Sequence, residues 1–351
     1  MATSQRYANG SGSQRVTEVA REEIYFRVYQ SFGHRRDCGT VLREQRPDLP
    51  LALALVSWLS IARNTCITMK KPLLVLLIPG LILVVLLQVG FWLTRPALHE
   101  IGAPPTDLPI RPVALPSQSG STLRGWFVPG RRGKGAILLM HGIHANRLAM
   151  LARARFLHCA GYSVFLFDFQ AHGESPGHCV TFGAVESLDA YAAAKYLRRQ
   201  VQGEKVGAIG TSLGGAAALL GREPLPVDAL VLESVYPTIE EATANRLRLH
   251  FGRFGPLLTP WLMLQMWLQF GISASELQPI ERVQTMAIPV FVIAGTEDQH
   301  TTVAESLRIF GAANVAKEWW GIEGAAHVDL YQFAPPAYEE RILSFFARTL
   351  H

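Results

Sequence analysis

Residues 206–220 read VGAIGTSLGGAAALL. The first of these residues are typical of a short buried strand and the last of a helix, and one serine, Ser212, stands among glycines between them. Gly210 and Gly214, two positions before and after it, let the backbone turn sharply because they carry no Cβ. A serine at such a turn exposes its hydroxyl, and the helix beyond it offers free N–H groups. The pattern predicts either a nucleophilic serine or a turn that merely packs closely, and the rest of the chain decides between them.

The sequence from about residue 104 onward alternates between apolar strands and helices. Short apolar runs predict strands at 123–128, 136–140, 163–169, 205–209, 229–232, 290–294 and 316–320. Helical patterns lie at 146–160, 184–200, 303–310 and 337–350. Apolar strands joined by helices indicate an α/β fold with a doubly wound, mostly parallel sheet.

One segment interrupts this alternation. Residues 237–283 contain no strand pattern, and their stretch LLTPWLMLQMWLQFGI is rich in Leu, Met, Trp and Phe. Ordinary core helices are one interpretation. We favour a helical insertion that caps a pocket, because an interruption this long inside an α/β domain is usually functional.

An uncharged apolar segment precedes the predicted domain. Residues 72–93 read PLLVLLIPGLILVVLLQVGFWL, which is long enough to cross a hydrocarbon core of about 30 Å as a helix. Lys70 and Lys71 stand before it, Trp92 stands at its far end, and no small-residue cleavage site follows. We therefore predict a retained signal anchor at 69–95, with a buried core helix as the alternative.

The placement of positive charge predicts how this anchor is oriented. Residues 1–71 contain 11 Lys and Arg against 6 Asp and Glu, whereas the remaining 22 basic and 22 acidic residues cancel. The basic flank predicts a single-pass membrane protein with a cytoplasmic N-terminus and the 104–351 domain on the opposite, periplasmic or extracytoplasmic, side. A neutral domain gives no support for nucleic-acid binding. Residues 1–68 are polar and without periodicity, and we interpret them as a disordered extension or as sequence upstream of a natural start at Met69.

Two further residues supply what a nucleophilic serine needs. Thr296, Glu297 and Asp298 follow a predicted strand, and Asp298 is our choice of acid, with Glu297 second and Glu233, which follows an earlier strand, third. His327 follows the last predicted strand and is our choice of base, because His300 is close to Asp298 in sequence. The order Ser212, Asp298, His327 predicts a catalytic triad, in which the histidine takes the proton of the serine and the aspartate orients the histidine. A helix cap for Asp298 and a solvated loop position for His327 are the alternatives.

An oxyanion site needs two N–H donors. Leu213 follows the serine and supplies one, and Ile143, in the loop HGIHAN after an earlier strand, is our choice for the second. His141 and His144 in that loop also raise the possibility of a zinc site, which lacks a third ligand in the sequence. Among the four cysteines, only Cys159 and Cys179 lie in the predicted domain, and the sequence leaves open whether they pair.

The successive motifs LLMHG, FDFQAHGES, GTSLGG, GTEDQHT and GAAHVDL resemble those of the α/β-hydrolase superfamily, especially its serine-aminopeptidase-like and lysophospholipase-like members. The resemblance covers roughly residues 104–350. It implies an eight-stranded sheet with a cap after the sixth strand. The chain departs from the family at the turn 168–175, where Gln170 and Ala171 stand in place of the usual Arg and Gly.

These features together predict a membrane-anchored serine hydrolase. Its substrates would be carboxylic esters, of lipid or acyl-glycerol type, and its chemistry requires no metal or organic cofactor. A peptidase or amidase would use the same three residues, with a cap carboxylate such as Glu240, Glu241 or Glu276 to receive an α-amino group. A non-catalytic module that only binds a ligand in the pocket is the third alternative.

Overall fold

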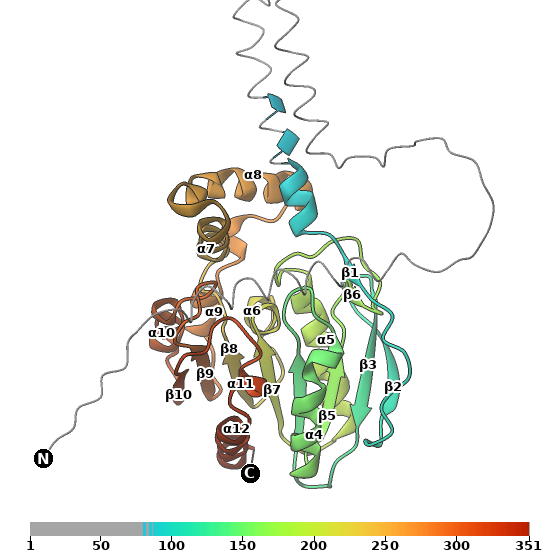
Figure 1. Ribbon diagram of the computed structural model, residues 1–351. Helices are drawn as coiled ribbons and strands as arrows, with labels where there is room; N and C mark the ends of the chain where they lie inside the picture. The colour runs from blue at the N-terminus through green and yellow to red at the C-terminus, as the bar shows by residue number, and fades with distance from the viewer. Residues whose placement is uncertain (1–79, 82–83, 86, 351) are drawn as a thin grey trace, which may run out of the picture. The chain divides into compact units, whose positions relative to one another are not determined.

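A computed structural model of the chain describes residues 80–81, 84–85 and 87–350 (Figure 1). Residues 1–68 and most of the first half of the predicted anchor lie outside the described residues. Residues 87–93 are helical and lead into the domain. Within the described part of the chain, no helix combines the length and apolar character needed to span a bilayer.

An eight-stranded sheet with the order β10-β9-β8-β7-β4-β5-β3-β2 forms the centre of the domain. Strands β4, β5 and β7 to β10 run parallel, whereas β3 is antiparallel to both of its neighbours. The strands of this sheet are β2 (Arg111–Pro116), β3 (Thr122–Val128), β4 (Ala136–Met140), β5 (Ser163–Phe167), β7 (Val206–Thr211), β8 (Ala229–Glu233), β9 (Val290–Gly295) and β10 (Lys317–Ile322). The predicted mostly parallel sheet and its eight strands are confirmed.

Helices cover both faces of the sheet because the buried strands are apolar on both faces. Leu138 of β4 belongs to one core cluster with α5 (Glu186–Gln200), α6 (Leu213–Leu220) and α10 (Val303–Ala312). Its neighbours Ile137 and Leu139 belong to the opposite cluster, with α4 (Leu151–Cys159) and α12 (Pro335–Thr349). Successive strand residues point to opposite faces, so each strand contributes to both clusters.

Smaller elements complete the domain. A separate parallel pair joins β1 (Ala97–Leu98) to β6 (His172–Gly173), which fastens the segment after the first helix to the turn beyond β5. The remaining short elements are η1 (Arg147–Met150) and α11 (Leu330–Phe333). Cys159 and Cys179 are both free thiols, so the disulfide left open by the sequence is not formed.

The segment between β8 and β9 is helical. It comprises α7 (Ile239–Phe251), η2 (Gly252–Leu258), α8 (Thr259–Phe270), η3 (Ala274–Glu276) and α9 (Pro279–Val283), and it follows the sixth strand of the sheet. Figure 1 shows α7 and α8 beyond the end of the sheet, with α8 beside the helix that enters the domain. The side chain of Gln265 in α8 donates to the carbonyl of Leu87, 2.8 Å away, and Gly90 lets the two helices approach closely.

Candidate active site

Ser212 lies at the tip of the turn between β7 and α6. Its backbone angles, φ 48° and ψ −107°, fall in a region that a residue with a side chain rarely adopts. A Cβ at Gly210 would press on the backbone of Gly215, and one at Gly214 would overlap the carbonyl of Met140. The turn therefore requires both glycines, and it holds the serine in a strained conformation that the surrounding packing imposes.

Asp298 and His327 meet at the same edge of the sheet. Asp298 Oδ2 lies 2.7 Å from His327 Nδ1, and Asp298 Oδ1 accepts from the backbone N–H groups of His300 and Thr301, each at 2.8 Å. Burial alone would raise the pKa of Asp298, but the hydrogen bond from His327 and the backbone donors bring it below its ordinary value. Asp298 is thus held as a carboxylate that fixes the orientation of the imidazole.

The loop that carries His327 is placed by β9. A Cβ at Gly295, the last residue of β9, would collide with the carbonyl of Ala325, so the loop passes directly over the end of this strand. The N–H of Glu297 donates to the same carbonyl at 2.9 Å. These contacts bring two residues separated by 29 positions together, which the sequence spacing alone does not reveal.

The other two candidate acids are engaged or placed differently. Glu233 is fully buried and binds Arg153 at 2.9 Å, Thr211 Oγ1 at 2.7 Å and the hydroxyl of Tyr338. Glu297 is exposed to solvent. Of the three candidates, Asp298 is the one hydrogen-bonded to His327.

The serine and the imidazole are not hydrogen-bonded in this state. Among the described residues, Ser212 Oγ forms no hydrogen bond with His327, whose side chain is 22% exposed. Strands β7, β8 and β9 are parallel neighbours, and Ser212 follows the carboxyl end of β7 as Asp298 follows that of β9. Hydrogen bonds between catalytic groups commonly tighten only when substrate is bound.

The loop after β4 lies against the serine. A Cβ at Gly142 would stand 3.8 Å from the Cβ of Ser212, and Ile143 packs against the buried cluster that contains Leu213. Neither the N–H of Ile143 nor that of Leu213 donates to an acceptor within the described residues. Both predicted oxyanion donors thus belong to segments beside Ser212 and have unused N–H groups.

His141 determines how this loop is oriented. The N–H of Phe169 donates to His141 Nε2 at 3.1 Å, so the proton of the neutral ring is on Nδ1, which donates to the carbonyl of Gly142 at 2.7 Å. The carbonyl of Gly142 and the N–H of Ile143 belong to one trans peptide and point in opposite directions. By holding the carbonyl, His141 turns the N–H of Ile143 the other way.

The same contacts bear on the zinc alternative. Burial, with a smaller contribution from His172, lowers the pKa of His141 to about 3, so the ring is neutral, and both of its nitrogens are occupied. No cluster of three or more His, Cys, Asp or Glu in the described part of the chain is arranged to hold a metal ion. His141 is instead a structural residue of the loop, a role that the sequence did not indicate.

The turn that departs from the family pattern also lies in this region. Ala171 adopts φ 58°, a conformation that glycine favours. The Gln170 side chain donates to Glu186 at 2.8 Å and to the carbonyl of Cys179 at 2.7 Å. No cation is paired with the neighbouring Asp189 among the described residues, and burial raises the pKa of this carboxyl to about 7. The Gln170 substitution therefore leaves two buried carboxyls without a basic partner.

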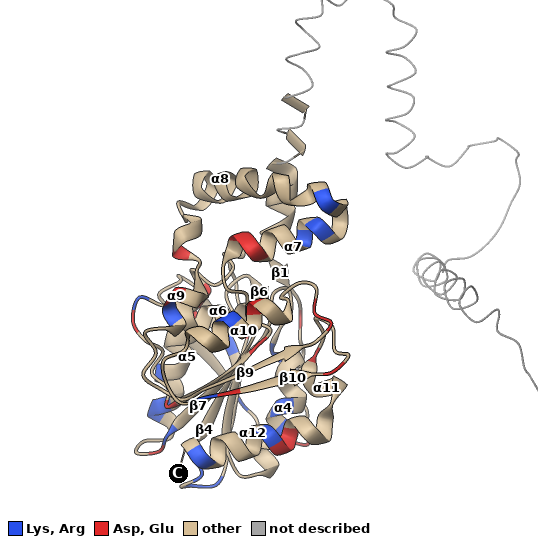
Figure 2. Ribbon diagram, turned by 90° about the vertical axis from the view of Figure 1, so that its left-hand side faces the viewer, with Lys and Arg blue, Asp and Glu red and all other residues tan. Residues whose placement is uncertain are grey.

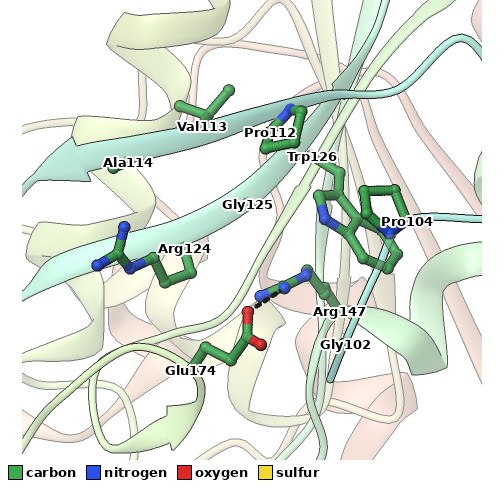
Figure 3. Close-up of a pocket in the computed structure, with 10 residues that line it drawn as sticks. All are labelled: Gly102, Pro104, Pro112, Val113, Ala114, Arg124, Gly125, Trp126, Arg147 and Glu174. Atoms are coloured by element: carbon green, nitrogen blue, oxygen red, sulfur yellow. Dashed lines mark hydrogen bonds and ion pairs between the residues drawn. The ribbon is translucent and has the colours of Figure 1, made fainter. Parts of the chain in front are cut away.

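Another part of the domain contains a pocket. It measures about 560 Å³ and lies against β2 and β3, where Arg147 is sandwiched between Trp126 and Glu174 (Figure 3). Arg147 also pairs with the buried Asp168. None of the proposed catalytic residues lines it, and these ion pairs hold the loops after β4 and β5 together.

The fold and these motifs can be compared with known proteins. The family profile described as serine aminopeptidase, S33, matches residues 131–278. The uncharacterized protein Rv2307c of Mycobacterium tuberculosis is 32% identical over 223 residues, which cover 62% of this chain and 73% of the relative. The chain belongs to the serine aminopeptidase S33 family of the α/β-hydrolase superfamily.

Other relatives of this family member extend the comparison. The α/β hydrolase domain-containing protein WAV2 of Arabidopsis thaliana is 29% identical over 195 residues, covering 53% of this chain and 60% of that protein. The esterase Pf2001 of Pyrococcus furiosus superimposes with a TM-score of 0.60 at 24% identity, covering 73% of this chain and 100% of the esterase chain. At this level of identity the superposition shows a shared α/β-hydrolase fold.

Proposed function

We propose that the protein is a membrane-anchored serine hydrolase that cleaves carboxylic esters through an acyl-enzyme. The observation that carries this proposal is that a strained serine, Ser212, lies at the same edge of the sheet as the hydrogen-bonded Asp298 and His327. The structurally similar protein Pf2001 is named an esterase, which supports an ester substrate for this chain.

The proposed mechanism assigns one task to each group. His327 Nε2 takes the proton of Ser212 as its Oγ attacks the ester carbonyl carbon, and Asp298 stabilises the imidazolium that forms. The N–H groups of Leu213 and Ile143 bind the oxyanion, each contributing on the order of 3 kcal/mol. His327 then protonates the departing alcohol, and a water molecule, deprotonated by the same imidazole, releases the acid.

The preference for lipid or acyl-glycerol substrates rests on the surface of the cap. Helix α8 contains no charged residue, in contrast to α7 beside it (Figure 2). It is apolar on more than one face: Leu262 and Met266 are buried, whereas other large apolar side chains of the cap are exposed. These exposed residues are Leu249, Phe251, Phe254, Leu257, Trp261, Leu264, Trp267 and Leu268. An apolar surface of this kind is typical of a membrane or protein contact.

A membrane is the occupant that we propose for this surface. The apolar helix at 87–93 contacts α8 through Gln265, and it continues the uncharged segment that begins at residue 72. Phe91 and Trp92 on this helix are also exposed, each at 58%. We propose that residues 72–93 anchor the protein in a bilayer, with the N-terminus cytoplasmic and the hydrolase domain on the opposite side.

Ester hydrolysis by the full-length protein in non-ionic detergent tests this proposal. We expect turnover of p-nitrophenyl butyrate and of 1-monoacylglycerols, and its loss in Ser212→Ala. Equal rates for the wild type and Ser212→Ala would contradict the proposed nucleophile. Flotation with phosphatidylcholine vesicles tests the anchor, and protein that remains at the bottom of the gradient would contradict it.

A peptidase of the same fold is the second candidate function, and the carboxylate of Glu240 in the cap favours it. Glu240 Oε2 is buried with no hydrogen-bond partner in the described part of the chain, so it is able to receive an ammonium group. The other two candidate carboxylates are engaged, Glu241 with Arg308 and Glu276 with Ser273. Faster cleavage of aminoacyl amides than of matched esters would support this candidate over the first.

A further inference from the structure

The cap helix α7 is fastened to the loop that carries Asp298. Asn245 Nδ2 donates to the carbonyl of His300 at 3.2 Å and to Glu305 Oε1 at 2.8 Å. The next residue, Arg246, is partly buried. This turn of α7 therefore lies directly against the acidic side of the proposed active site.

The positive charge of Arg246 acts electrostatically on groups of several loops. The pKa values of His144 and His300 are lowered, chiefly by burial and in part by Arg246. The raised pKa of Tyr236, due to its burial, is moderated by the same charge, and Asp298 acts in turn on Arg246. These groups lie on the separate loops that follow β4, β8 and β9. The cation is thus close to three of the loops that surround Ser212.

Arg246 differs from the two buried arginines among the described residues in having no hydrogen-bond or ion-pair partner. Arg147 and Arg153 each bind two carboxylates. The guanidinium of Arg246 forms no hydrogen bond or ion pair with any residue that the structure describes. Both oxygens of Asp298 are already hydrogen-bonded, to His327 and to two backbone N–H groups.

A partly buried guanidinium without a hydrogen-bond or ion-pair partner is energetically unfavourable. Burial lowers the pKa of Arg246 from its ordinary value, and Asp298 opposes that change. A guanidinium stays protonated at neutral pH and presents up to five donors. A partly buried charge without a partner is unfavourable unless an anion completes it. The free donors of Arg246 are therefore available to a group that enters with the substrate.

We propose that Arg246 is a substrate-binding residue that receives an anionic group, a phosphate or a carboxylate, a few atoms from the scissile ester carbonyl. This inference deepens the proposed ester hydrolase, on which it rests, by narrowing its substrates to negatively charged esters. It also separates the two candidate functions, because Arg246 would repel the α-ammonium group of an aminopeptidase substrate.

Binding measured without turnover tests the site independently of catalysis. In full-length Ser212→Ala protein in non-ionic detergent, calorimetry would compare octyl phosphate and octanoate, as the two anion sources, with neutral 1-octanol. The variants are Arg246→Gln, which removes the charge, and Arg246→Lys, which retains it without the planar fork. Arg253→Gln removes one exposed positive charge from the same cap and is the matched control.

We expect Arg246→Gln to weaken binding of at least one anion by about 10- to 100-fold, the range for one charge-assisted hydrogen bond. Binding of octanol should change less than about threefold, and Arg246→Lys should lie between Arg246→Gln and the unsubstituted residue. The anion whose binding is weakened more by Arg246→Gln shows whether the site receives a phosphate or a carboxylate. The proposal is overturned if all three ligands bind the parent equally, if Arg246→Gln weakens octanol as much as the anions, or if Arg253→Gln has the same effect.

Kinetics with the Ser212-containing enzyme distinguishes this proposal from the proposed function. The pair 1-octanoylglycerol and 1-octanoylglycerol 3-phosphate differs only in the phosphate. We expect Arg246→Gln to reduce kcat/KM for the phosphate ester relative to the neutral ester by a similar factor. Absence of all ester turnover alongside Arg246-dependent anion binding would refute the hydrolase and support the site, whereas turnover of both esters with an unchanged ratio would refute the site alone.

Discussion

Replacement of His141 tests the orientation of the oxyanion loop. This residue is fully buried, and its Nδ1–H holds the carbonyl of Gly142 and so directs the N–H of Ile143. His141→Ala removes that donor. His141→Asn is the matched variant, because an Asn amide nitrogen occupies about the position of Nδ1 and still donates to Gly142.

The expected magnitude follows from the value of one oxyanion donor. Loss of a single donor lowers kcat by about 10²- to 10³-fold, or roughly 3 to 4 kcal/mol in the barrier. We expect His141→Ala to approach this range with KM changed less than about threefold, since the donor acts on charge that develops in the transition state. His141→Asn should retain most of kcat.

Both variants lose stability for a separate reason. The N–H of Phe169 donates to His141 Nε2, and neither Ala nor Asn reaches that position. A buried donor left without an acceptor costs about 1 to 3 kcal/mol. The assay is therefore steady-state hydrolysis of p-nitrophenyl butyrate at 15 °C, on samples whose folded fraction is checked by near-ultraviolet circular dichroism.

Two results would refute this reasoning. One is folded His141→Ala enzyme with kcat within threefold of the wild type. The other is His141→Asn that is folded and loses as much kcat as His141→Ala. In either case the carbonyl of Gly142 would not control the oxyanion donor.

Three further predictions concern the buried carboxyls. Asp298→Asn should lower kcat by about 10⁴-fold with little change in KM, because the amide favours the wrong tautomer of His327; a loss below tenfold would contradict it. The folded-state pKa of Asp189 is raised to about 7, so this carboxyl favours folding below about pH 4, and its contribution, on the order of 4 kcal/mol, is lost as the pH rises through 7. In urea titrations at pH 5 and pH 8, the free energy of unfolding of Asp189→Asn should therefore depend less on pH than that of the wild type. The same change in this free energy for both proteins would count against the prediction. Arg153→Met leaves Glu233 buried without its cation, and urea unfolding should show a loss of about 3 to 5 kcal/mol; a change under 1 kcal/mol would show that the pair is not stabilising.

The sequence predicted the elements whose local patterns are strong. The apolar strand 136–140 was predicted at its observed bounds, and the serine turn was predicted between a strand and a helix. Strand β2 was missed because Pro112 and Pro116 disrupt a strand pattern, which is tolerated here because β2 is an edge strand. The two-residue pair of β1 and β6 is too short to give any periodic signal.

The features of the site that the sequence did not predict depend on contacts between segments that are distant in the sequence. Sequence order suggested Asp298 and His327, but only the passage of the 324–326 loop over Gly295 explains their contact. The sequence left a zinc site open at His141, because the hydrogen bonds of its ring to Gly142 and Phe169 are visible only in the three-dimensional structure. Arg246 has no sequence signal, since an arginine on a helix is ordinarily exposed.

Covalent labelling of Ser212 tests the central claim most directly. The full-length protein would be treated with a fluorophosphonate, digested and mapped by mass spectrometry, with His327→Ala as the control that keeps the serine and removes its base. We predict about one label per chain, located on the peptide that contains Ser212 and nearly absent from His327→Ala. A folded protein that remains unlabelled, or that carries the label on another serine, would contradict the proposed nucleophile.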